Sequence, residues 1–433
     1  MLNISVVVPS WHYWMNPIKL QPLWELYYAT LLRERSPNVN VDVIDLRGRE
    51  KSDQVELPER DVYLYWIMKS ADAPEVYGIV SDTKRKYTNS IHIAGGNHVD
   101  HMTDECTGIF DASIVGSGEE LLLQAITDFG SHKLRSVYRS PTTFSFDSYS
   151  FPQRDFIPSS RIVNDEHFAQ HGKAIPGTGV YFSRGCSFKC SFCVYNNPSK
   201  FELRRPEQIT DELRYLKQHY GVHGVNLRDE VCIPVNRKEA IAQLDAIAAE
   251  NIVWRGQTIP IGAEDIIVLA RQSGCLELAI GLESVESDAI LKLSNKPSTS
   301  IDANRRFIEL LKKHGIKVKV CLIFGMPGET NQVVDKTIRF LEEVKPDYVA
   351  LSGLDPVPGS PFYNNPKSFG IKTIDGDLSK HAHLMFRFGD DEDIGLPFEY
   401  EEQTPWGPSL SRKQIADNIR TVQQYLRDHG MTY

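Results

Sequence analysis

The sequence has little that would suggest a membrane, secreted or nucleic-acid-binding protein. Its 433 residues contain 48 Lys and Arg against 57 Asp and Glu, so the formal net charge is −9 and an extended basic surface for nucleic acid is not expected. It has no run of about 18 apolar residues, so we expect no transmembrane helix. The first residues, MLNISVVVPSWHYW, lack the basic start and the small-residue cleavage site of a secretory signal. We therefore expect a cytoplasmic protein that does not contact a membrane.

Cysteine is also scarce, and its pattern does not fit a disulfide-bonded protein. The chain has 7 cysteines, an odd number, and no secretory signal, so a disulfide framework is not expected. Three of the cysteines lie close together in the sequence, whereas the others are scattered. The full set is Cys106, Cys186, Cys190, Cys193, Cys232, Cys275 and Cys321.

The first 130 residues predict an open, parallel, Rossmann-like α/β sheet. Short apolar segments alternate with helical stretches, which is typical of parallel strands connected by helices. The expected strands are residues 3–9, 41–46, 62–67 and 91–96, and residues 112–120 are expected to contain a further strand, a glycine turn and the start of a helix. Ligands of such sheets bind at the carboxyl ends of the strands. Those ends are residues 10–14, 69–72, 95–98 and 116–119.

Residues 131–175 are expected to be a connector, and residues 176–352 a second α/β domain. The connector is rich in Ser, Thr, Pro and aromatic residues and has no helical period. In residues 176–352, apolar strands alternate strictly with helices, which predicts a partial (β/α)6 barrel whose chemistry lies at the carboxyl ends of its strands. The expected strands are residues 179–183, 222–227, 252–258, 276–281, 316–324 and 348–352.

Residues 353–433 are expected to form a C-terminal extension over the mouth of the barrel. They begin with an irregular, proline-rich segment and end with a helix from about residue 412 to 429. The acidic and aromatic stretch 398–411 has two interpretations. It either covers the barrel mouth and contacts a polar substrate, or it is an inert part of the surface.

The clustered cysteines follow the first strand of the predicted barrel. Cys186, Cys190 and Cys193 have the spacing C-x-x-x-C-x-x-C within SRGCSFKCSFCVY. A structural zinc site needs four closed ligands, and the sequence offers no fourth Cys or His at a suitable spacing. Three thiolates fit a [4Fe-4S] cluster in which one iron lacks a protein ligand. The alternatives are a zinc knuckle or three buried cysteines brought together by chance.

This cysteine segment resembles the signature of radical S-adenosylmethionine (SAM) enzymes. The resemblance implies that the three cysteines bind a [4Fe-4S] cluster and that SAM binds its open iron. It also implies that an external donor, such as flavodoxin or ferredoxin, supplies an electron that cleaves SAM to a 5′-deoxyadenosyl radical. Phe192, directly before the third cysteine, matches the family's aromatic position beside the adenine.

Further segments resemble family motifs in the expected order. NLRDEVC follows the second barrel strand, and the resemblance implies that Asp229 and Glu230 bind the SAM amino group, since an ammonium needs charge-assisted acceptors. The other interpretation of this segment is a solvated acidic loop. The remaining matches are IGLES after the fourth strand and FGMPGET after the fifth. By this resemblance, the candidates for contacts with SAM or substrate are Glu283, Ser284, Gly325, Pro327 and Gly328.

Segments outside the barrel resemble one branch of the family, in which a cobalamin-binding domain precedes the barrel. The matching segments are IAGGNHVDH (93–101), DASIVGSGEE (111–120) and VPGSPFY (357–363). Glycines 95–96 and 116–118 would let the backbone approach the nucleotide tail of cobalamin closely.

The same region also departs from the cobalamin-binding pattern. The cobalt-ligating motif D-x-H-x-x-G is absent, and four bulky residues, 11–14, follow the first strand. His12 and His98 lie at strand ends and are possible ligands, although a single histidine is more often an ordinary polar contact. Cobalamin binding therefore stays an open alternative.

The function expected from these motifs is radical SAM chemistry on a small, natural-product-like or sugar-like substrate. Dehydration or rearrangement is the main expectation, and cobalamin-dependent C-methylation is the alternative. A non-catalytic iron–sulfur electron carrier is a second alternative, but it would not need Asp229, Glu230 or the Gly-Pro-Gly turn. Cys232 is a candidate hydrogen donor because it follows these carboxylates. Its other interpretation is a buried structural cysteine, as we expect for Cys275 and Cys321.

Overall fold

The computed structural model describes the chain as two compact units. The first contains residues 1–164 and 377–382, and the second contains residues 165–376 and 383–433. The boundary after Asn164 falls inside the segment expected to be a connector. The description leaves out Met15, 51–52, 140–144, Asp165, Lys173, 196–200, Ile261, 298–299, 383–394 and Tyr433.

The N-terminal unit is built on a parallel sheet of six strands in the order β2-β1-β3-β4-β5-β6. This confirms the predicted open α/β sheet. The strand β6 was missed by the sequence analysis because three residues are too few to show an apolar pattern. The strands are β1 (Leu2–Val8), β2 (Val39–Asp45), β3 (Val62–Trp66), β4 (Ile91–Gly95), β5 (Ala112–Val115) and β6 (Val137–Arg139).

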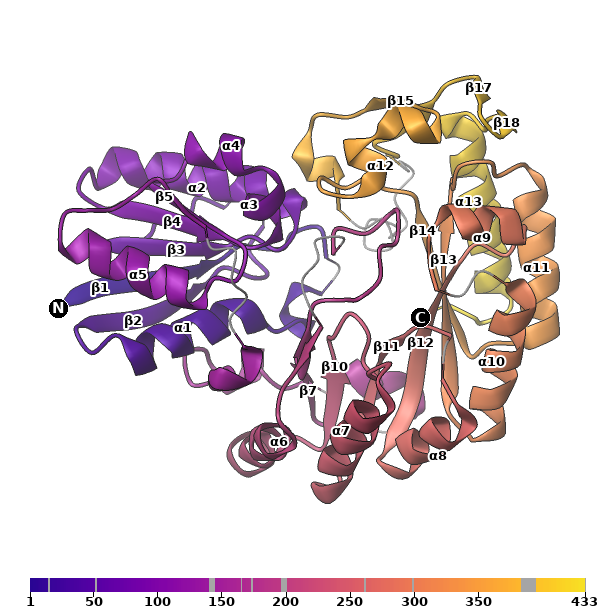
Figure 1. Cartoon of the computed structure of the whole chain (residues 1–433), viewed down its shortest axis with the longest axis horizontal. Helices are drawn as coiled ribbons and strands as arrows, with labels where there is room; N and C mark the ends of the chain where they lie inside the picture. Colours follow the sequence, from indigo (N-terminus) through magenta and orange to yellow (C-terminus); the bar gives the residue numbers. More distant parts are fainter. Residues whose placement is uncertain are drawn as a thin grey trace. The chain divides into compact units, whose positions relative to one another are not determined.

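Helices cover both faces of this sheet (Figure 1). Helices α1 (Leu23–Arg35) and α5 (Glu119–Gly130) pack on one face, over strand residues such as Leu64 and Ile93. Helices α2 (Ala73–Lys86), α3 (Asn97–His101) and α4 (Thr103–Thr107) pack on the other face, over Tyr63, Tyr65 and Ala94. The two cores take alternate residues of the same strands, as the two-residue period of a β-strand requires.

The second unit contains another parallel sheet of six strands, in the order β14-β13-β12-β11-β10-β7. Strands and helices alternate as expected for a partial barrel. The strands are β7 (Gly177–Val180), β10 (Gly224–Leu227), β11 (Val253–Thr258), β12 (Cys275–Glu283), β13 (Lys317–Phe324) and β14 (Tyr348–Gly353). The connecting helices are α6 (Pro206–Tyr220), α7 (Arg237–Ala249), α8 (Glu264–Gln272), α9 (Asp288–Leu293), α10 (Ile301–Lys313) and α11 (Gln332–Val344).

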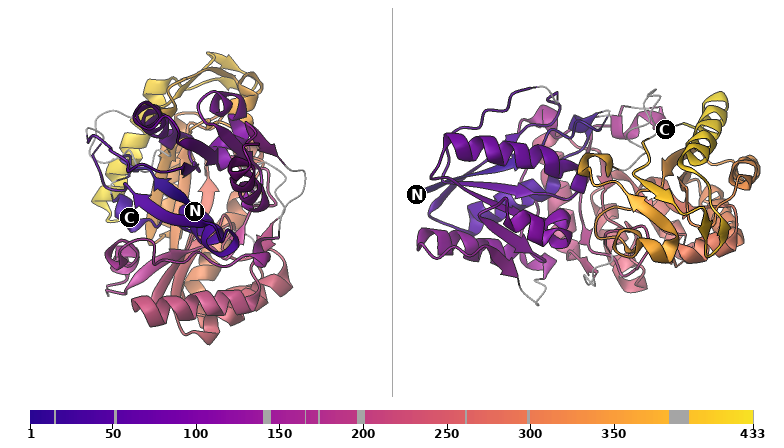
Figure 2. Two further views of the ribbon diagram at one scale, coloured as in Figure 1. Left: turned by 90° about the vertical axis from the view of Figure 1, so that its left-hand side faces the viewer. Right: turned by 90° about the horizontal axis from the view of Figure 1, so that it is seen from above.

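The C-terminal part of the second unit adds short strands and a long helix. Helix α13 (Arg412–Asp428) begins with a capping box between Ser411 and Gln414 and packs beside α11 and β14 (yellow in Figure 2). This confirms the helix predicted at the end of the chain. The other elements are α12 (Pro361–Asn364), β15 (Ile371–Ile374), β16 (Phe398–Tyr400), β17 (Gln403–Thr404) and β18 (Gly407–Pro408), and the hairpin β8 (Ser183–Arg184) with β9 (Glu202–Leu203) follows β7.

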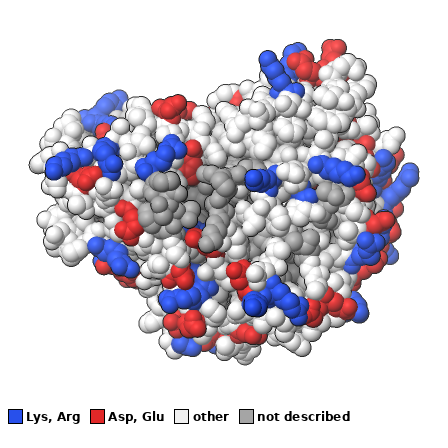
Figure 3. All heavy atoms as spheres, viewed as in Figure 1, with Lys and Arg blue, Asp and Glu red and all other residues white. Residues whose placement is uncertain are grey.

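The surface of each unit carries charges of both signs. On the face shown in Figure 3, lysines and arginines alternate with aspartates and glutamates over both units. None of the described helices combines the length and the apolar character needed to cross a bilayer.

Candidate functional site

The three clustered cysteines lie on a loop after β8 that is tied to the segment following α9. Cys186, Cys190 and Cys193 are free thiols and are partly buried. The backbone N–H of Ser191 donates to the Ser294 carbonyl at 2.9 Å, and the Ser191 hydroxyl donates to the Leu293 carbonyl, also at 2.9 Å. The loop is therefore fixed to the carboxyl end of α9 (Asp288–Leu293), the helix that follows β12.

The chemistry of this loop fits a cluster better than a single ion. Burial raises the pKa of Cys190 to about 11 and that of Cys193 to about 12, so the protein alone does not stabilise the thiolates and positively charged irons would have to do so. Within the described residues, no group of three or more His, Cys, Asp or Glu side chains could hold one metal ion together. A [4Fe-4S] cluster binds each cysteine through a different iron, so it does not need three sulfurs to converge on one point.

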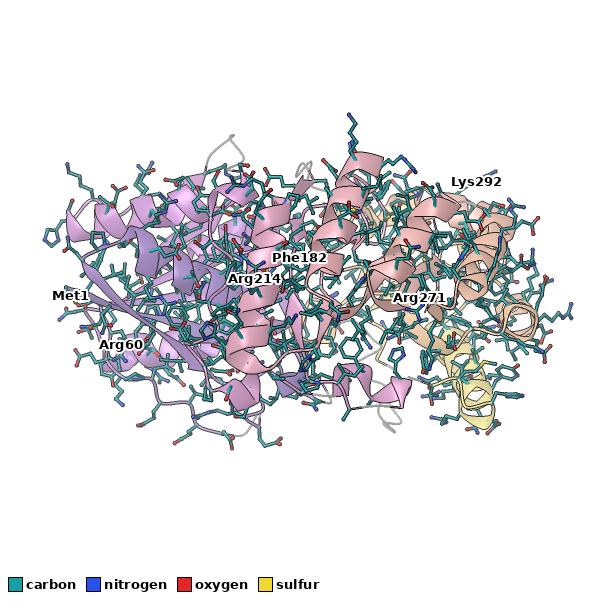
Figure 4. All side chains as sticks on the ribbon, turned by 90° about the horizontal axis from the view of Figure 1, so that it is seen from below. Met1, Arg60, Phe182, Arg214, Arg271 and Lys292 are labelled. Atoms are coloured by element: carbon teal, nitrogen blue, oxygen red, sulfur yellow. The ribbon has the colours of Figure 1, made fainter. Side chains whose placement is uncertain are left out.

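Asp229 supports the entrance to the cysteine loop. It follows β10, is 3% exposed, and accepts hydrogen bonds from the backbone N–H of Phe182, at 3.1 Å, and of Ser183. Phe182, labelled in Figure 4, is itself fully buried. All these bonds go to Oδ1, whereas Oδ2 is buried without a hydrogen-bond partner. Desolvation raises the Asp229 pKa to about 7.

Glu230 provides a second buried acceptor next to Asp229. Its Oε2 atom also lacks a hydrogen-bond partner, and desolvation raises its pKa to about 8, with the Asp229 charge adding to the increase. Buried polar atoms normally have partners. Two adjacent carboxylate oxygens without partners therefore fit a cationic group of a ligand, which would supply both the missing donors and the compensating charge. This is the arrangement expected for the SAM ammonium group.

The IGLES segment ends β12 in an irregular conformation. The pairing with β13 shifts between Gly281 and Glu283, and Glu283 has φ +65°, which is uncommon for a residue other than glycine. Its carboxylate forms an ion pair with Lys296 at 2.5 Å, with the two side chains only 8% and 5% exposed. Lys296 was missed by the sequence analysis, although it ends the quoted segment IGLESVESDAILKLSNK. Because Lys296 neutralises Glu283, this carboxylate differs from those of Asp229 and Glu230.

The IGLES and FGMPGET segments are tied together by buried side chains. The Ser284 hydroxyl donates to Glu329 Oε1 at 3.2 Å, and Glu329 Oε2 accepts from the Gly325 backbone N–H at 2.6 Å. Glu286 accepts from the backbone N–H of Thr330 at 3.0 Å. Ser284 therefore links two loops, and its expected contact with SAM or substrate stays a prediction. The roles of Glu286 and Glu329 were not predicted from the sequence.

The Gly-Pro-Gly turn is covered by the C-terminal segment. Gly325 and Gly328 have φ +87° and +82°, so both positions favour glycine, and Pro327 between them is buried. A Cβ atom at Gly325 would lie 3.1 Å from Ile415 and 3.6 Å from Phe398, and one at Gly328 would lie 3.3 Å from the Trp406 Cβ. The Tyr400 hydroxyl donates to the Gly325 carbonyl at 2.7 Å.

This contact bears on the expected role of residues 398–411. The segment packs on the loop after β13, which lies at the carboxyl ends of the strands as expected for a cover, and Tyr400 orients the backbone there. Phe192, expected beside the adenine, is partly exposed on the cysteine loop. Its role and those of Pro327 and the two glycines stay predictions.

The solvent exposure of two cysteines bears on the roles expected for them, Cys232 as a hydrogen donor and Cys321 as a buried structural residue. Cys232 is fully buried, and a Cβ atom at Gly256 would lie 2.8 Å from its sulfur, so the thiol is enclosed between the end of β10 and β11. A hydrogen donor must be reachable by a substrate radical, and so the structure favours the structural alternative for Cys232. Cys321 on β13 is partly exposed between the buried residues Val320 and Leu322, and desolvation raises the pKa of its thiol.

A separate cavity lies in the N-terminal unit. It holds about 570 Å³ between the end of β1, residues 49–50 and 53–57, and α2. Glu75 in its lining already accepts from the backbone N–H and the hydroxyl of Ser10, each at 2.8 Å. A cavity with acidic residues in its wall does not by itself indicate a ligand.

The histidines considered as cobalt ligands have partners within the same unit. His98 is 2% exposed, with Nε2 at 2.7 Å from the Tyr77 hydroxyl and Nδ1 at 3.0 Å from the Ser70 hydroxyl. Burial lowers its pKa to about 4, so it is neutral. His12 Nδ1 lies 3.3 Å from the Ser10 hydroxyl. Neither ring nitrogen of His98 is free to bind cobalt.

Comparisons with known proteins agree with this site. Residues 180–341 match the family model of the radical SAM superfamily. A bacteriochlorophyllide d C-12(1)-methyltransferase from Chlorobaculum tepidum is 26% identical over 315 residues, covering 70% of this chain and 65% of that protein. The chain thus spans just under two thirds of this relative's length. The C-8(2)-methyltransferase of the same organism is 22% identical over 427 residues, covering 93% and 88% of the two chains.

A solved structure shares the architecture of nearly the whole chain. It is the radical SAM methyltransferase TsrM from Kitasatospora setae, with cobalamin and a [4Fe-4S] cluster bound, and it matches with a TM-score of 0.69. The match covers 97% of this chain and 90% of that one at 16% identity, so it shows the fold alone. The family match, the cysteine loop and this fold agree on a radical SAM domain in residues 180–341, which an open Rossmann-like sheet precedes in the sequence.

Proposed function

We propose that this chain is a cobalamin-dependent radical SAM methyltransferase that acts on a small molecule. The observation that carries the SAM part is the pair of partnerless carboxylate oxygens, on Asp229 and Glu230, beside the cysteine loop. The methyltransferase part is supported by the relatives, which are named as methyltransferases. It replaces dehydration or rearrangement as the main expectation, because those relatives favour the methylation alternative.

Two groups of the protein's own residues would hold SAM. Cys186, Cys190 and Cys193 would bind the cluster, whose open iron supplies the position for SAM. Asp229 and Glu230 would accept from the ammonium group. When bound, the cluster supplies the electron that a radical reaction of SAM needs, and a flavodoxin or ferredoxin is the proposed source of that electron.

Cobalamin is the proposed methyl carrier because the matching architecture was solved with it. In this chain, the carboxyl ends of β1, β3, β4 and β5 would face the corrin. Because both ring nitrogens of His98 have partners, His98 would not serve as a ligand of the cobalt. The cytoplasmic location and the small-molecule substrate stay predictions.

The test is to follow the methyl group of SAM. The full chain is purified anaerobically from cells given hydroxocobalamin, the cluster is reconstituted, and SAM labelled in its methyl group is added with a low-potential reductant. Label transferred to the bound corrin, in the wild type and not in Cys193→Ala, supports the proposal. Formation of 5′-deoxyadenosine by a cobalt-free protein would instead favour dehydration or rearrangement. Stoichiometric zinc in place of iron would reject both.

A further inference from the structure

Trp66 occupies the carboxyl end of β3 in the N-terminal unit. It is the last residue of the strand, and its side chain lies on the face covered by α1 and α5. The ring is 6% exposed and lies against the ring of Tyr28 from α1, with centroids 3.7 Å apart and an interplanar angle of 32°. Two aromatic rings therefore fill the space between the sheet and these two helices.

The glycines at this edge of the sheet fit the Trp66 ring. A Cβ atom at Gly95, the neighbour of Trp66 on β4, would overlap this ring. A Cβ atom at Gly118, directly before α5, would overlap the same ring and lie 2.8 Å from the Tyr28 hydroxyl. Both glycines are thus explained by the protein's own packing.

The neighbouring glycines lead to the same conclusion. Gly96 has φ +99°, and a Cβ atom there would lie 2.7 Å from the Ile67 carbonyl oxygen, so the backbone of β3 requires a glycine at this position. Gly116 has φ +91° and has open space where a Cβ would lie. The sequence analysis attributed glycines 95–96 and 116–118 to the nucleotide tail of cobalamin. That interpretation does not fit Gly95, Gly96 or Gly118 as the structure places them.

We propose that the rings of Trp66 and Tyr28 occupy the space between α1 and α5 and thereby prevent the nucleotide tail of cobalamin from entering it. This inference rests on one part of the proposed function, namely that the N-terminal unit binds a corrin. A corrin would then bind at the strand ends with its tail outside this unit's core. A tail that entered would have to displace a buried indole from a space shaped by two glycines, and close-packed interiors offer no second place for a ring of that size.

The test compares two corrins that differ in the tail. Hydroxocobalamin carries the nucleotide, whereas dicyanocobinamide has the same macrocycle without it. Dissociation constants of both are measured on the full, cluster-reconstituted chain by visible absorption after gel filtration. For the wild type we expect the two constants to agree within about threefold, because the nucleotide would gain no buried contacts.

Two substitutions of Trp66 then test the proposal, one that removes the ring from the space between α1 and α5 and one that keeps a ring there. Trp66→Ala should create a preference for hydroxocobalamin over dicyanocobinamide of about tenfold or more, equivalent to roughly 1.4 kcal/mol. Trp66→Phe keeps a ring over the glycines and should behave like the wild type. Circular dichroism checks that both variants are folded. The ratio of the two dissociation constants in the wild type tests the proposal even if a variant does not fold.

Each outcome decides the proposal. A wild type that prefers hydroxocobalamin at least tenfold would overturn it, as would a folded Trp66→Ala protein without a new preference. If the wild type binds neither corrin but Trp66→Ala binds hydroxocobalamin, the closed site is supported while the cobalamin-dependent function is rejected. The failure of one proposal is therefore distinguishable from failure of the other.

Discussion

The chain contains two parallel sheets of six strands, and the carboxyl ends of the strands differ between them. In the second unit, buried carboxylate oxygens of Asp229 and Glu230 have no hydrogen-bond partner. In the first unit, Gly95 and Gly118 at the strand ends fit Trp66, and Asp72 accepts from the Tyr13 hydroxyl at 2.7 Å. Motif-like residues at strand ends therefore do not by themselves indicate a ligand.

The largest effect is expected for the cysteine loop, on which the contrast between the units depends. Cys186→Ala, Cys190→Ala or Cys193→Ala should remove the cluster, because each iron bound by the protein depends on one thiolate. Iron and sulfide analysis after anaerobic reconstitution should fall from about four of each per chain to near zero. Cys106→Ala, in the core of the N-terminal unit, is the matched control and should keep full iron. Full iron in a loop variant would contradict the assignment.

Glu230→Gln tests whether the partnerless carboxylates bind SAM. The substitution keeps the shape and removes the charge, so it should weaken SAM binding by roughly 1.5–3 kcal/mol, the contribution of a hydrogen bond to a charged group. Isothermal titration with the reconstituted protein measures this. Glu264→Gln, on the surface and paired with Lys313, is the control. Unchanged SAM affinity in Glu230→Gln, with a full cluster, would move the ammonium site elsewhere.

Glycine substitutions test the packing around Trp66 in the first unit, and this test needs no ligand. Gly118→Ala and Gly95→Ala should each destabilise the protein by about 1–3 kcal/mol, because the new methyl group would overlap the buried Trp66 ring. Gly78→Ala in α2 is the control. It has open space at the Cβ position and should stabilise the chain by about 0.4–1 kcal/mol. Denaturant unfolding measures all three, and an unaffected Gly118→Ala would contradict the packing seen around Trp66.

Sequence reasoning predicted the two sheets, whereas its interpretation of Gly95, Gly96 and Gly118 does not fit their packing. The roles of the cysteine loop and of the two carboxylates stay predictions. Strand and helix periods are local, so β1 to β5 and the barrel strands could be predicted, whereas the three-residue β6 could not. A glycine in a sequence, in contrast, indicates only that a Cβ atom does not fit at that position. It does not show whether a ligand or another side chain of the protein occupies the space where the Cβ would lie. Trp66, 29 residues before Gly95, and Lys296, 13 residues after Glu283, could be connected with their partners only through the fold.

The raised pKa values of the carboxylates predict a pH dependence of SAM binding. The pKa of Asp229 is about 7 and that of Glu230 about 8 in the ligand-free protein, so both are largely protonated at pH 6. Binding of an ammonium favours their charged forms, and each must lose its proton first. SAM affinity should therefore rise between pH 6 and 7.5, by up to about tenfold per pH unit for one proton released. In Glu230→Gln the slope should be smaller, and an equal slope would exclude Glu230 as its source.

The smallest effect is expected where the C-terminal segment meets the Gly-Pro-Gly turn. Tyr400→Phe removes the hydroxyl that donates to the Gly325 carbonyl and leaves the ring packed beside Phe398. A neutral hydrogen bond contributes about 0.5–1.5 kcal/mol, so SAM affinity should fall by up to about tenfold if the turn contacts the adenine. Iron content should not change, since the cysteine loop makes none of these contacts. Tyr425→Phe on α13 is the control and should bind SAM like the wild type. A loss of thermal stability in Tyr400→Phe without any loss of SAM affinity would show that the C-terminal segment only packs on the turn and does not position it.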